Sequence, residues 1–139
     1  MPLRAALVSL LIVLAAACGR DEDRAADRLL LQYVHRLRDE TDAGVAERRA
    51  LLAAVARQRA RSDVAIAAQA ACHDAYTKLV NAEEAIDRAE REVHRLLVLR
   101  EPTGDAAADL SRAEEGLAAA RAAMPACDAA AARLAIAVR

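Results

Sequence analysis

Residues 106–138, AAADLSRAEEGLAAARAAMPACDAAAARLAIAV, contain the most regular apolar pattern in the chain. Apolar residues recur there in alternating steps of four and three, which is the heptad spacing of a helix that packs lengthwise against a partner. Pro125 lies outside this row, so we expect it to bend the helix without ending it. The row consists of Ala106, Leu110, Ala113, Leu117, Ala120, Met124, Cys127, Ala131, Leu134 and Val138.

The segment before it carries a matching row, with large side chains in one heptad position and mostly alanine in the other. Small residues in one position allow two helices to approach closely. The turn-forming residues Glu101–Asp105 separate the two rows, which predicts an antiparallel helical hairpin. This second row consists of Cys72, Ala75, Leu79, Ala82, Ile86, Ala89, Val93 and Leu96.

Cys72 and Cys127 each occupy one of the two rows, at similar distances from the predicted turn. Antiparallel helices packed 8–10 Å apart leave facing Cα atoms roughly 4–6 Å from one another, which is within reach of a disulfide. We therefore predict that Cys72 and Cys127 form a disulfide. The alternatives are two unpaired buried cysteines or a pair of metal ligands.

The chain as a whole is predicted to be all-α, because no alternating strand pattern competes with the helical one. A further turn cluster, Thr41–Gly44, gives helices over about 21–40, 45–98 and 105–138. We expect an alanine-rich antiparallel hairpin within a three-helix, coiled-coil-like bundle. A break near Ser62, a good helix cap, would make it a four-helix bundle. Alanine supplies half of the 56% apolar fraction and there is no Phe or Trp, so the core should be thin.

The first 17 residues have the parts of an export signal. Arg4 precedes an apolar run over residues 5–14, and the small residues Ala15–Ala17 follow. The run is too short to span a bilayer, which takes about 20 apolar residues. We expect residues 1–17 to be a cleaved leader, 18–22 a short tether that starts at Cys18, and 23–139 a single helical domain.

The segment Leu14–Gly19, LAAACG, resembles the lipobox of bacterial lipoproteins. In that class the cysteine is acylated and becomes the new amino terminus, which implies that Cys18 carries palmitate-type lipid. The third position before the cysteine is usually Leu in the class, whereas Ala15 stands here. Ala15–Ala17 also satisfy the rule for an ordinary signal peptide, which is the alternative. The residue after the cysteine is Gly19 and not Asp, so the resemblance implies that the protein is located at the periplasmic face of the outer membrane.

Composition and motifs argue against catalysis and against nucleic-acid binding. The net charge is −1, and the arginine run over residues 57–61 has no neighbouring aromatic residues. After the leader only Ser62 and Ser111 could serve as serine nucleophiles, and the glycines stand alone, so neither a nucleophile elbow nor a phosphate loop is present. We expect no enzyme activity, no nucleic-acid partner and no cofactor.

The three histidines are His35, His73 and His94. Asp87, Glu90 and His94 lie on one stripe of a helix and could ligate a metal. Asp87 and Arg91 are an ordinary pair four residues apart, so we interpret the stripe as a solvated charged face and expect no metal.

Leu96, Leu97, Val98 and Leu99 are consecutive, so they cannot all face the partner helix. One interpretation is that the first helix or a second copy of the chain covers these residues. The other is that they form an exposed tip that binds a partner. The leading hypothesis is a membrane-tethered, non-catalytic helical scaffold or adaptor with a protein partner in the cell envelope, or self-association. The alternatives are a helical bundle that binds a small ligand or metal, and an accessory lipoprotein of the phage or conjugation type.

Overall fold

A computed structural model describes residues 2–40, 42–100 and 104–139, with side chains described from Asp21 onward. This part of the chain contains no strand, which confirms the predicted all-α class. Residues 18–22, for which a tether was expected, belong to the first helix. The elements are α1 (Pro2–Asp39), α2 (Val45–Arg57), α3 (Asp63–His94), a π-helical turn η1 (Arg95–Leu99) and α4 (Ala106–Ala137).

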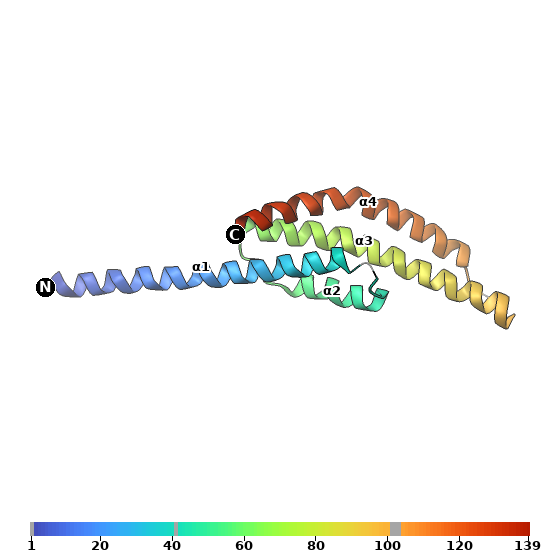
Figure 1. The fold of residues 1–139 in the computed structure, drawn as a ribbon, viewed down its shortest axis with the longest axis horizontal. Helices are drawn as coiled ribbons and strands as arrows, with labels where there is room; N and C mark the ends of the chain where they lie inside the picture. The colour runs from blue at the N-terminus through green and yellow to red at the C-terminus, as the bar shows by residue number, and fades with distance from the viewer. Residues whose placement is uncertain (1, 41, 101–103) are drawn as a thin grey trace.

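The helices form a bundle in the middle of the molecule, and a two-helix arm extends from one end of it (Figure 1). Helices α3 and α4 pair as an antiparallel hairpin along their whole length, and α1 and α2 pack against its base. Beyond the ends of α1 and α2, the hairpin continues alone as a two-helix arm that ends at η1. The amino-terminal half of α1 projects from the opposite end of the bundle.

The predicted break near residue 62 is confirmed, so within the described residues the bundle has four helices. The chain leaves the helical conformation after Arg57 and re-enters it at Asp63. Ser62 caps α3, because its hydroxyl oxygen accepts a hydrogen bond from the Ala65 N–H at 3.1 Å. Buried Asp27 of α1 fixes this turn in place by accepting hydrogen bonds from the Arg61 N–H at 3.0 Å and the Ser62 hydroxyl at 2.6 Å.

The larger side chains of the core gather at the base of the hairpin, where all four helices meet. Helix α1 contributes Leu30, Val34 and Leu37, which are at most 2% exposed. The disulfide between Cys72 and Cys127 lies in the same cluster, with its Cα atoms 4.4 Å apart, which confirms the predicted pairing. The other fully or nearly buried members are Leu51, Leu52, Val55, Ala65, Ala68, Ala75, Tyr76, Val80, Ala130, Ala131 and Leu134.

A buried ion pair attaches α2 to α3. The Arg48 guanidinium donates to Glu83 Oε1 at 2.6 Å, and only 10% and 21% of the two side chains are exposed. Burial raises the pKa of Glu83, while the neighbouring Arg48 charge opposes that rise. Both charges are therefore needed at this contact, since either one alone would be left partly buried without compensation.

The arm is built from small residues, and this corrects one expectation from the sequence. Ala82, Ala89, Ala113 and Ala120 are buried between α3 and α4. The large members of the two rows were expected to share that interface, but Val93, Leu96 and Leu110 are 42%, 52% and 49% exposed. The reason is close approach: a Cβ added to Gly116 would lie 2.9 Å from the Ala82 Cβ. Bulky side chains do not fit there and lie on the flank.

Candidate functional site

The end of the arm exposes the four consecutive apolar residues that the sequence marks as a candidate partner-binding site. Leu96, Leu97, Val98 and Leu99 are 52%, 73%, 61% and 56% exposed. The helix stops immediately after them, at Arg100, whose backbone is left-handed with φ 56° and whose N–H donates to the Arg95 carbonyl. Consecutive helical residues point in different directions around the axis, so α4 can cover only part of this set.

An apolar groove begins beside these residues and runs between α3 and α4. The hollow nearest the tip has a volume of about 430 Å³. Glu90 and His94 stand at its edge. Concave apolar surfaces with a few polar groups at the rim are the usual form of a binding site. The apolar side chains that line it are Ile86, Ala89, Val93, Leu97, Val98 and Leu110.

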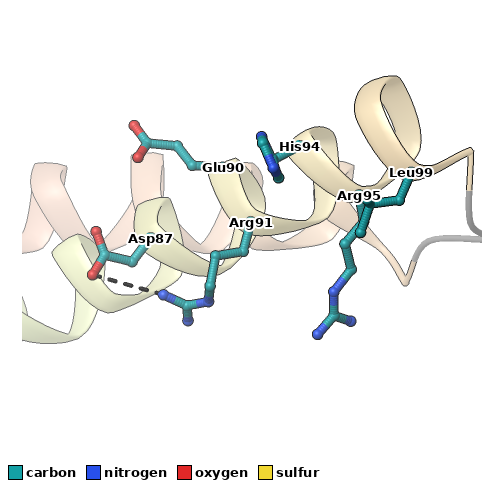
Figure 2. Close-up of a pocket in the computed structure, with 6 residues that line it drawn as sticks. All are labelled: Asp87, Glu90, Arg91, His94, Arg95 and Leu99. Carbon is teal, nitrogen blue, oxygen red and sulfur yellow. Dashed lines mark ion pairs between the residues drawn. The ribbon is translucent and has the colours of Figure 1, made fainter.

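The outer side of α3 near the tip is charged and shallow. Figure 2 shows the six residues that line this hollow: Asp87, Glu90, Arg91, His94, Arg95 and Leu99. Asp87 turns toward Arg91, with which it forms an ion pair at 4.0 Å, and the Glu90 carboxylate points away from His94 (Figure 2).

The three side chains considered as metal ligands, Asp87, Glu90 and His94, therefore do not converge. Within the described residues no group of three or more His, Cys, Asp or Glu side chains is placed to hold a metal. The other two histidines lie far from the tip in sequence, His35 in α1 and His73 in the first half of α3.

A carboxylate that the sequence did not reveal ties the two helices of the arm together. Asp109 of α4 is 4% exposed and accepts hydrogen bonds from Arg112 at 2.7 Å and from Arg88 of α3 at 3.1 Å. These hydrogen bonds, that from Arg112 first, lower the pKa of Asp109 below its ordinary 3.8, against the opposing effect of burial. The stability that this contact gives to the folded chain is fully present above the ordinary pKa of 3.8. It is lost as the pH falls through the lower pKa that Asp109 has in the folded state.

The predicted lipidation site, Cys18, lies outside the described side chains, although its backbone belongs to α1. Among the residues that the structure describes, no helix combines the length and the apolar character needed to cross a bilayer. Comparisons with protein-family models, with curated proteins and with solved structures gave no match.

Proposed function

We propose that the chain is a bacterial lipoprotein, acylated at Cys18, that serves as a non-catalytic helical scaffold. In this proposal the leader is removed, the lipid holds the protein at the periplasmic face of the outer membrane, and Leu96–Leu99 bind another component of the envelope. The lipobox-like sequence before Cys18 supports acylation at this position. Several acyl chains, at about 0.8 kcal/mol per buried CH₂, would hold the protein stably in a membrane.

The observation that carries the docking role is the placement of the two ends of the molecule. Cys18 belongs to α1, whose amino-terminal half projects from one end of the bundle, while η1 lies at the other end of the hairpin (Figure 1). The 32 residues of α3 alone span about 48 Å at the helical rise. An anchor at one end and four exposed apolar side chains at the other fit a protein that presents a binding surface away from its membrane.

Replacing Cys18 is expected to remove the anchor. The Cys18→Ser variant should move from the membrane fraction to the soluble fraction, or accumulate unprocessed, and should fail to incorporate labelled palmitate. The control is Ser111→Ala, a small change at an exposed residue of α4, which leaves the proposed acylation site intact and should stay with the membrane. Unchanged fractionation of Cys18→Ser would exclude lipid anchoring at this position.

Placing a charge on the tip is expected to abolish partner capture without unfolding the chain. Leu97→Asp should lower crosslinked recovery of the partner from native envelopes by on the order of thirtyfold, the loss of about 2 kcal/mol at an interface hot spot. Ile136→Asp is the control, because Ile136 is 72% exposed against 73% for Leu97 but lies at the base. The free energy of unfolding of both variants should lie within about 0.5 kcal/mol of that of the parent chain. If Leu97→Asp alone melts the fold, the tip is structural instead.

A further inference from the structure

Helix α1 packs against both helices of the hairpin at the base, whereas the groove on the arm is open. Leu79 and Met124 pack against the core cluster that includes Val34 and Leu37 of α1. Helix α1 ends at Asp39, and it contacts both α3 and α4. Ile86 and Val93 follow Leu79 at heptad spacing, so they continue the same row beyond the end of α1.

The open part of the groove has the dimensions of a single helix. From Leu79 to Leu97 the row covers a rise of about 27 Å, which corresponds to roughly 18 helical residues. Leu110, Leu117 and Met124 form the facing row on α4. A second hollow of about 330 Å³ is lined by Leu79 together with Leu117 and Met124. Helix α1 buries Leu30, Val34 and Leu37 in the core cluster at the base, in steps of four and three, and we expect a helix in the open groove to use the same spacing.

Carboxylates lie on both rims of the open groove, with His94 beside Glu90 on the α3 side. Glu90 lies between Ile86 and Val93 on α3, and Glu114 occupies the corresponding position between Leu110 and Leu117 on α4. Both residues are exposed, and neither forms an ion pair with another described residue. Farther toward the base, Arg121 and Asp128 also line the groove and offset one another in charge. The nearby arginines, Arg88 and Arg91 of α3 and Arg95 of η1, occupy the other helical positions, away from the apolar row.

We propose that this groove binds an amphipathic helix of a partner protein, with an apolar row in steps of three and four and Lys or Arg on both sides of that row. The inference rests on the docking function proposed above for this end of the arm, and it adds the chemistry of the partner. A second copy of the chain fits less well, because its arm would bring its own Glu90 and Glu114 against the same carboxylates.

The test uses the full chain in nanodiscs of zwitterionic lipid and synthetic 18-residue helices that carry a photoreactive residue in a leucine row. One peptide has lysine on both sides of the row, a second has glutamate there, and a third has the composition of the first with the row scrambled. We expect crosslinks from the lysine peptide alone, mapped by mass spectrometry to peptides containing Ile86, Val93 or Leu110. The variant Glu90→Lys with Glu114→Lys should weaken the lysine peptide by on the order of tenfold and favour the glutamate peptide.

The inference would be overturned if the lysine and scrambled peptides labelled the chain equally, or if the labels fell outside the groove. It would also be overturned if the charge-reversed variant labelled with both peptides as the parent does. So would a dimer of the chain, seen by sedimentation, whose formation excludes the peptide. None of these outcomes removes the docking role itself, because loss of partner capture in Leu97→Asp is measured independently of the peptides. Failure of both experiments would exclude the arm as a binding element altogether.

Discussion

Reduction of the Cys72–Cys127 disulfide is expected to lower the free energy of unfolding by about 4 kcal/mol. The bridge closes a loop with a sequence separation of 55 residues, and opening it returns that much chain entropy to the unfolded state. Domains of this size have a net stability of only about 5–15 kcal/mol. Because alanine supplies much of the buried surface of the hairpin, we expect the bridge to provide a large share of that stability.

The measurement is urea unfolding followed by circular dichroism, with and without a thiol reductant. The double variant Cys72→Ala with Cys127→Ala should be destabilised to a similar degree and should no longer respond to the reductant. A single transition at the same urea concentration for the oxidised and the reduced parent chain would show that helix packing alone stabilises the hairpin.

The hairpin and its disulfide could be predicted because both depend on spacing along the sequence. A heptad row that recurs on either side of a turn sets the register of two antiparallel helices, and the register brings Cys72 opposite Cys127. The break between α2 and α3 was readable from Ser62 for the same reason, since capping is a local interaction.

Features that depend on how each helix is rotated about its axis could not be predicted. The heptad pattern placed Leu110 and Val93 in the helix interface, but the close contact of Gly116 with Ala82 turns these larger side chains onto the flank. The contact of Arg88 with Asp109 and that of Arg48 with Glu83 join residues 21 and 35 positions apart, and they appear only once the helices are placed. The sequence predicted that Leu96–Leu99 cannot share one helix face, but it left open whether the first helix covers them, and in the structure they are exposed.

Replacing Gly116 with leucine is expected to cost about 3 kcal/mol, the upper end of the range for overpacked contacts. A Cβ at this position would meet the Ala82 Cβ at 2.9 Å and would also lie 3.5 Å from the Lys78 carbonyl oxygen. These atoms belong to a helix backbone and its first side-chain carbon, so they cannot swing aside, and the two helices must separate. Separation removes contacts along the alanine rows on both sides of the substitution.

The same close contact determines whether a smaller substitution at Gly116 stabilises or destabilises the chain. Gly116→Ala should gain about 1 kcal/mol of helix propensity, yet we expect it to destabilise the chain in thermal and urea unfolding, because its Cβ still meets that of Ala82. Adding Ala82→Gly should restore part of the loss by reopening the space, whereas Ala119→Leu on the exposed side of α4 should stay within about 0.5 kcal/mol of the parent. A stabilised Gly116→Ala chain would mean that the helices of the arm are not in close contact at this point, and the apolar row on the flank would then need another cause.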